Sequence, residues 1–75
     1  MSVLTKQKKV LREVHQHIAY LRECDLESER GIADASKMSK HEAHRIGSAY
    51  CLTPEQIKGI EESFNTLLHT LASVK

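Results

Sequence analysis

Residues 53–75 of this chain read TPEQIKGIEESFNTLLHTLASVK, and this stretch decides how the rest must be organised. Thr53 has the hydroxyl of an N-cap residue, Pro54 suits the first helical position because its missing N–H would be unpaired there, and Gln56 completes a capping box. Apolar residues then recur at steps of three and four, which places them on one helical face. The sequence therefore predicts a helix over residues 54–74 whose apolar face needs a partner. That face comprises Ile57, Ile60, Phe64, Leu67, Leu71 and Val74, with Leu68 widening it.

A second amphipathic helix is predicted over residues 5–24. Its apolar residues also fall at steps of three and four, and no proline or glycine interrupts them. Thr5 has the side chain of an N-cap residue. We expect the apolar face of this helix to pack against the face of residues 54–74, and we expect the same faces to drive self-association. The apolar residues of the second helix are Val10, Leu11, Val14, Ile18 and Leu21.

The region between these helices, residues 29–50, is rich in small residues and gives a weaker helical signal. Residues 25–28 offer capping side chains where the apolar period loses phase, so we predict a break there. The small residues would let two longer helices approach closely. Ser39 and Glu42, however, are spaced as a capping box and indicate a bend over residues 36–39. The pattern therefore allows either one helix or two.

Composition favours an all-α fold. The chain has one Phe, two Tyr and no Trp, and only one Pro and three Gly interrupt its 75 residues. A chain this short buries a modest share of its surface, so its core is marginal. We predict a small three-helix bundle or a helical hairpin with two long amphipathic helices. We expect homodimerisation to complete its core.

Charge and cysteine usage narrow the functional classes. The formal net charge is +1, which creates no large field favouring nucleic acid or membrane. No apolar run approaches the roughly 20 residues of a membrane span, so we expect a cytoplasmic protein with no membrane association. We expect Cys24 and Cys51 to be reduced thiols rather than a disulfide. Neither cysteine has a neighbouring histidine arrangement that indicates catalysis, and we expect no enzymatic activity and no cofactor.

One side of the helix predicted over residues 5–24 carries basic residues at steps of three and four. Lysines in its first turns oppose the helix dipole, which favours acidic groups at an N-terminus. The simplest interpretation is a solvated face, and the sharper one is a surface for an acidic protein or a phosphate backbone. We predict that a protein partner, of unidentified nature, binds around Lys8, Arg12, His15 and Arg22 or around Tyr50; Ala19 lies on the same side.

The middle region also resembles a helix-turn-helix unit over about twenty residues. Five residues fall at the spacings of that motif, namely Ala33, Lys37, Met38, Ala43 and Ile46. The sequence departs from the motif at the turn, where Lys37 stands in place of the usual glycine, and Gly47 weakens the second helix by about 1 kcal/mol relative to alanine. The resemblance implies that outward-facing side chains contact nucleic acid. These are Lys40, His41, His44, Arg45 and Ser48.

Five histidines raise a metal hypothesis. His15 and His17 are two residues apart, which directs them to different sides of a helix, whereas His41 and His44 share a face. A four-ligand site would need Cys24 or Cys51 as well. We therefore predict no metal site.

Three functions remain in order of preference. The first is a non-enzymatic protein-interaction module, a small adaptor, inhibitor or regulator of the kind also found on mobile elements, which rests on analogy of size and build. The second is a small dimeric helix-turn-helix-like DNA-binding regulator. The third is a metal-linked sensor.

Overall fold

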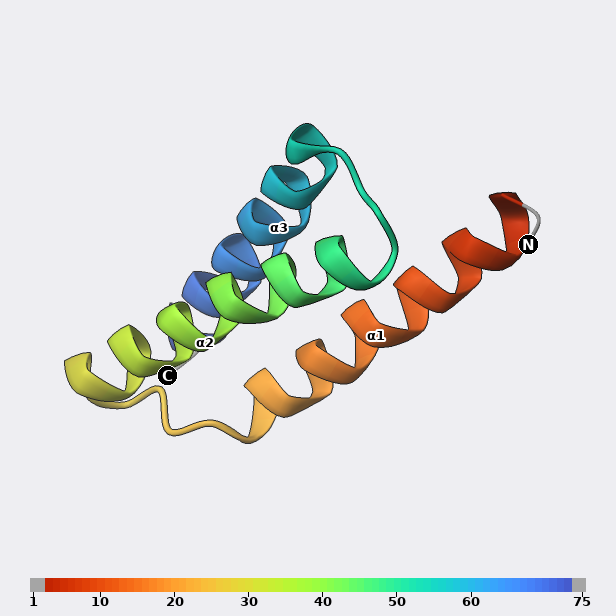
Figure 1. Cartoon of the computed structure of the whole chain (residues 1–75). Coiled ribbons are helices and arrows are strands. Elements are labelled where there is room, and N and C mark those ends of the chain that lie inside the picture. Colours follow the sequence, from red (N-terminus) through yellow and green to blue (C-terminus); the bar gives the residue numbers. More distant parts are fainter. Residues whose placement is uncertain (1–2, 74–75) are drawn as a thin grey trace.

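The chain folds into three helices packed on one another, so the all-α prediction is confirmed and the two-helix hairpin is wrong. The computed structural model describes residues 3–73. It contains α1 (Val3–Glu23), α2 (Glu29–Ala49) and α3 (Pro54–Ser73), and no strand within those residues (Figure 1). Val74, assigned above to the apolar face of the last helix, lies outside the described residues. Homodimerisation stays a prediction.

The three helices do not pack equally closely. α2 and α3 form an antiparallel pair, and α1 runs alongside in the same general direction as α3 (Figure 1). α1 and α3 diverge toward their N-terminal ends, and the first turns of α1 project beyond the end of α2 (Figure 1). The resulting shape is elongated, with principal extents of 42 × 19 × 14 Å. The divergence leaves an open end between α1 and α3.

Two groups of buried side chains form the core. One lies near the α1–α2 connection and the other near the α2–α3 connection. α3 contributes Phe64 and Leu68, which are fully buried and one helical turn apart, whereas Leu67 is only half-buried. The inward side of α3 is therefore centred between Phe64 and Leu68. The buried sets are Leu21, Leu26, Ala35 and Leu68 in the first group, and Ala43, Ile46 and Phe64 in the second.

The α2–α3 connection is held by local hydrogen bonds. The N–H of Leu52 donates to the carbonyl of Gly47 at 2.9 Å, and Cys51 has φ of 52°, which together form the Schellman ending of α2. α3 then begins with the predicted capping box: the Thr53 N–H donates to Gln56 Oε1 at 2.9 Å, and the Gln56 N–H donates to Thr53 Oγ1 at 3.2 Å. The predicted start of α3 is confirmed.

The α1–α2 connection forms where the sequence indicates a break. Ser28 caps α2 by accepting a hydrogen bond from the Gly31 N–H at 3.0 Å, and Asp25 Oδ1 accepts from the Glu27 N–H at 3.0 Å. A side chain at Gly31 would begin 2.1 Å from the Asp25 carbonyl oxygen, so the connection crosses α2 closely. The helix α1 begins at Val3, so Thr5 lies inside α1 and is not its N-cap.

α2 is one continuous helix, so the bend considered over residues 36–39 is not formed. Ser39 is buried and its hydroxyl lies 2.9 Å from His17 Nε2, which is why it does not cap a second helix. The small residues do allow close approach: Gly47 is buried against Ile57 of α3.

None of the helices within residues 3–73 is long and apolar enough to cross a membrane.

Candidate interaction surface

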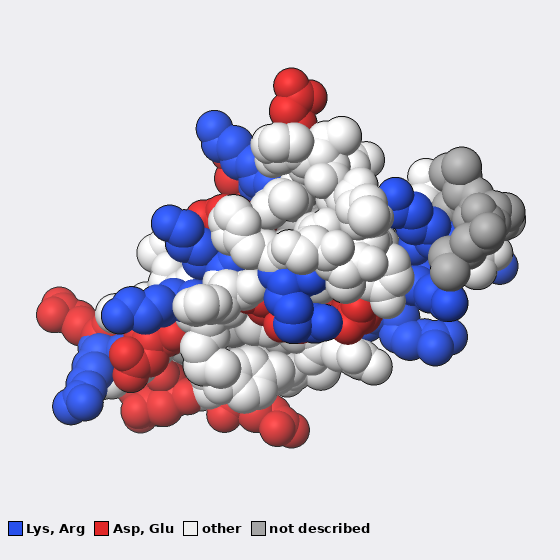
Figure 2. All heavy atoms as spheres, in the orientation of Figure 1, with Lys and Arg blue, Asp and Glu red and all other residues white. Residues whose placement is uncertain are grey.

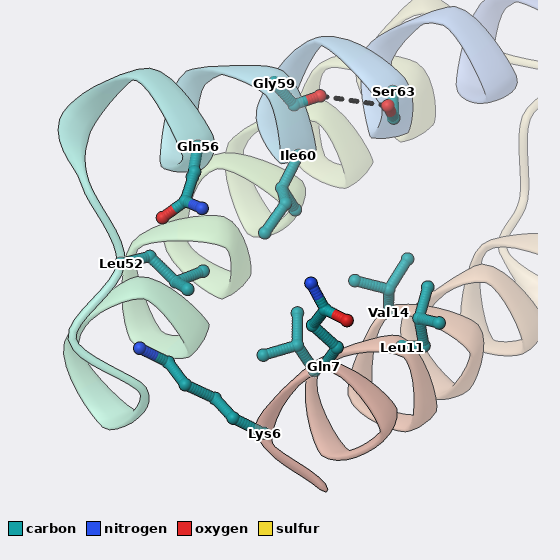
Figure 3. Close-up of a pocket in the computed structure, with 10 residues that line it drawn as sticks. Lys6, Gln7, Leu11, Val14, Leu52, Gln56, Gly59, Ile60 and Ser63 are labelled. Atoms are coloured by element: carbon teal, nitrogen blue, oxygen red, sulfur yellow. Dashed lines mark hydrogen bonds between the residues drawn. The ribbon is translucent and has the colours of Figure 1, made fainter. Parts of the chain in front are cut away.

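An open, mostly apolar groove lies between α1 and α3. It lies where the two helices diverge and has a volume of about 550 Å³. In Figure 3, Gln7 and Val14 of α1 point toward Ile60 of α3, and Leu11 lies beside Val14, farther from Ile60. Leu52 of the connection lies at the far end, and the Lys6 side chain extends toward it. We call this the α1–α3 groove. Its lining residues are Lys6, Gln7, Val10, Leu11, Val14, Leu52, Gln56, Gly59, Ile60 and Ser63.

The groove continues along α3 toward the C-terminal half of the helix. A second, shallower depression shares Gly59 and Ser63 with it and adds residues from the next two turns. The two depressions therefore form one surface that follows the α1–α3 boundary. The added residues are Ile18, Glu62, Thr66, Leu67 and Thr70.

One row of the α3 wall consists of small or hydroxyl-bearing residues, namely Gly59, Ser63, Thr66 and Thr70. The Ser63 hydroxyl donates to the Gly59 carbonyl at 2.9 Å, and the Thr70 hydroxyl donates to the Thr66 carbonyl at 2.9 Å (Figure 3 draws the first). These hydroxyl groups donate to carbonyls of their own helix, so they need no acceptor from a binding partner. A Cβ placed on Gly59 would meet no atom within 4 Å. This wall would admit the close approach of another backbone.

The two most exposed large apolar side chains within residues 3–73 lie on α1, at or near this groove. Leu11 is 55% exposed although it lines the groove, and Leu4, two helical turns earlier on the same side, is 61% exposed. Burying these large aliphatic side chains against a partner would lower the free energy, because it removes apolar surface from water. The α1–α3 groove therefore has both the shape and the exposed apolar residues of a protein-contact surface.

The basic stripe predicted on α1 is exposed and borders this groove. Lys8 and His15 lie three residues before and four after Leu11, which places them directly beyond it on the helix surface. Figure 2 shows Lys and Arg gathered over the beginning of α1, and Asp and Glu near the α1–α2 connection. Within residues 3–73, no ion pair is formed by the α1 cations Lys6, Lys8, Lys9, Arg12 and Arg22.

Tyr50 does not lie with the basic stripe. It is half-buried against the second core group, and the nearby Glu13 carboxylate raises the pKa of Tyr50. Arg45 binds the same carboxylate at 2.6 Å and Glu42 at 2.8 Å, and these hydrogen bonds hold the pKa values of Glu13 and Glu42 below their usual range. Arg45 is thus engaged in joining α1 to α2.

The remaining residues predicted to contact nucleic acid lie on the exposed side of α2. Because α2 is continuous, the turn of a helix-turn-helix unit at Lys37 is absent from the structure. Lys37, Lys40, His41 and His44 nonetheless line one shallow depression. His44 also lies 3.8 Å from Glu61 of α3, and Ser48 is exposed.

The residues assigned to self-association serve largely in the core of one chain. Phe64 is fully buried, and Ile57 and Ile60 pack against its group, while Leu71 packs against the other group. The facing α1 residues behave alike: Leu21 is fully buried, and Val10, Val14 and Ile18 pack against the second group. The two apolar faces therefore meet within a chain, and of the residues so assigned Leu11 and Leu67 remain most available at the groove.

His17, considered from the sequence only as a metal ligand, is a buried residue of the helix interface. It is 7% exposed, its ring lies 4.4 Å from that of Phe64 and 5.8 Å from that of Tyr20, and it contacts Ser39 of α2. Burial lowers the pKa of His17, and the Glu42 carboxylate opposes that shift. Its spacing gives the signal, since it stands seven residues after Val10 and four before Leu21.

No metal centre and no disulfide is assembled by the described residues. Within residues 3–73, no group of three or more His, Cys, Asp or Glu side chains could hold a metal ion. Cys24 and Cys51 are free thiols, and Cys24 Sγ donates to the Tyr20 carbonyl at 3.4 Å. The reduced state of both cysteines stays a prediction.

Comparison with known proteins adds no relative: no family model, no curated protein and no solved structure matches this chain.

Proposed function

We propose that this protein is a non-enzymatic protein-interaction module, a small adaptor, inhibitor or regulator, and that the α1–α3 groove is its binding surface. The observation that carries the proposal is the combination of an open apolar groove with Leu4 and Leu11 exposed beside it. A chain this short buries a modest share of its surface, so apolar side chains left in water contribute nothing to its stability. Their burial by another protein supplies the missing apolar contact.

The charges around the groove support the same proposal. The α1 cations make no ion pair within residues 3–73, so they remain available to orient a partner. Polar rims around an apolar centre are the usual arrangement of protein interfaces.

Site-specific photo-cross-linking in the cells that make the protein tests the proposal. A photoreactive residue at Leu11 should yield a discrete protein adduct. The same residue at Ser48, which is exposed on α2 outside the groove, is the matched control and should yield none. The absence of any discrete adduct at Leu11, or equal adducts at both positions, would refute the groove as a binding surface.

A second candidate is nucleic-acid binding through the exposed side of α2. It is favoured by the gathering of Lys37, Lys40, His41 and His44 around one depression. Phosphate contacts release counterions, so duplex binding through this surface should weaken steeply with salt and with the substitution Lys40→Glu. Duplex affinity that is unchanged by Lys40→Glu would count against it.

A further inference from the structure

We propose that the occupant of the α1–α3 groove is a second copy of this chain, in a two-fold dimer in which α1 of each chain lies over α3 of the other. The inference rests on the proposed function, because it names the partner of the same surface. Three independent features of the groove support it: an unused glycine, an exposed apolar ridge and a rim of mixed charge.

Gly59 is the first feature. A glycine inside a helix destabilises it relative to alanine, and here nothing within the chain requires one, since a Cβ would meet no atom within 4 Å. The next residues on the same side, Ser63 and Thr66, are also small. Such a row lets a second helix approach closely, as the buried Gly47 already does for α3 within the chain. Gly59 is explained if a helix from outside the chain lies over it.

The apolar ridge of α1 is the second feature. Leu4 and Leu11 are exposed and belong to the N-terminal half of α1. That half diverges from α3 (Figure 1). In a two-fold dimer each chain supplies one such ridge and one α3 wall. Both ridges are then covered at once, as the isologous interface of a symmetric dimer requires.

The charge of the rim is the third feature, and it selects a second copy over other helices. On α1 the rim is basic, with Lys8 and His15 on either side of Leu11. On α3 it carries a net negative charge, with Glu55 four residues before Gly59 and Glu62 three after it, and Lys58 beyond them in the depression on the α2 side. A uniformly acidic helix would be repelled by the α3 rim, and a uniformly basic one by the α1 rim. A second copy presents acid to the basic rim and base to the acidic rim.

The register of the two helices agrees with this pairing. Leu11 and Gly59 both line the groove, and α1 and α3 run in the same general direction (Figure 1). Counting back three residues from Leu11 and four from Gly59 places Lys8 at about the level of Glu55. A two-fold axis along the groove keeps these levels and exchanges the helices. Lys8 then meets Glu55 of the partner subunit. Neither residue has an ion pair within residues 3–73.

Sedimentation equilibrium and light scattering on the full chain test the proposal, with helical circular dichroism as the folding check. The wild-type chain should dimerise with rising concentration. Gly59→Leu should leave the helical signal intact and shift the chain to monomer. Ser48→Leu, a matched control on the exposed side of α2, should leave dimerisation unchanged.

Charge exchange supplies the decisive variant. Lys8→Glu and Glu55→Lys should each weaken dimerisation by about tenfold, because a two-fold interface makes each ion pair twice. The double variant should restore it. A chain that is monomeric at every accessible concentration, or a dimer that ignores Gly59→Leu and the charge exchange, would overturn the proposal. A monomer that still cross-links through Leu11 to a different protein would leave the proposed function standing and refute only the dimer.

Discussion

Alanine in place of Gly47 tests the close approach of α2 and α3. A Cβ at position 47 would lie 2.4 Å from both Cδ1 and Cγ1 of Ile57, well inside van der Waals contact. Gly59 offers a matched control on α3, since a Cβ there meets nothing within 4 Å. The same substitution therefore enters a filled space at one position and an empty one at the other.

The two positions should respond with opposite signs. Replacing a mid-helix glycine by alanine stabilises a helix by about 1 kcal/mol. At Gly59 nothing opposes this gain, so Gly59→Ala should raise the free energy of unfolding by about 0.5–1 kcal/mol. At Gly47 overpacking costs about 1–3 kcal/mol, because the branched Ile57 side chain has little rotamer freedom. The net effect of Gly47→Ala is a loss of about 1 kcal/mol.

Urea unfolding followed by helical circular dichroism measures both effects. Dilute samples avoid a contribution from self-association, and an unchanged slope against urea shows that the unfolding transition is the same. A double-mutant cycle then identifies the cause. On an Ile57→Ala background, where both clashing carbons are removed, Gly47→Ala should become stabilising. Equal effects at Gly47 and Gly59, or a Gly47 effect that persists with Ile57→Ala, would refute the close approach.

Three further predictions follow from the core and the caps. Leu68→Ala should cost about 2–5 kcal/mol of unfolding free energy and Leu67→Ala clearly less, since only Leu68 is fully buried; equal losses in urea unfolding would contradict the packing of α3. Thr53→Ala should cost about 1 kcal/mol through loss of the capping box, and an unchanged melting curve would place the start of α3 elsewhere. Because burial lowers the pKa of His17 in the folded chain, the unfolded chain binds its proton more readily, and stability should fall as pH drops below the ordinary histidine value of about 6.5. His17→Gln keeps a polar group for Ser39 and should flatten this pH dependence; an identical pH profile would show that other groups set it.

The structure departs from expectation mainly where one residue type can serve two environments. Ser39 has the spacing of a cap, yet its hydroxyl lies against His17, because α2 continues through it and α1 brings a buried polar partner. Leu67 and Leu68 both fit the apolar pattern of α3, and the sequence gives no reason to prefer the second. The direction from which α1 and α2 approach α3 decides it.

The candidate surface was less accessible to prediction than the fold. The basic side of α1 is visible as a spacing pattern, and it is exposed as expected. The groove beside it depends on the divergence of α1 from α3, which no local pattern encodes. Some residues assigned to self-association, such as Phe64, are fully buried in the core of a single chain.

By itself the sequence determined an all-α chain, the amphipathic helices at its two ends, and where α3 begins. Those features depend on caps and spacings within one or two turns, such as the reciprocal hydrogen bonds of Thr53 and Gln56, and they are independent of distant contacts. Only the tertiary structure decided that Gly47 is packed while Gly59 is open. The reason is that a glycine's surroundings are set by the distance between helices far apart in the chain, and that distance is fixed by how side chains of all three fill the space between them.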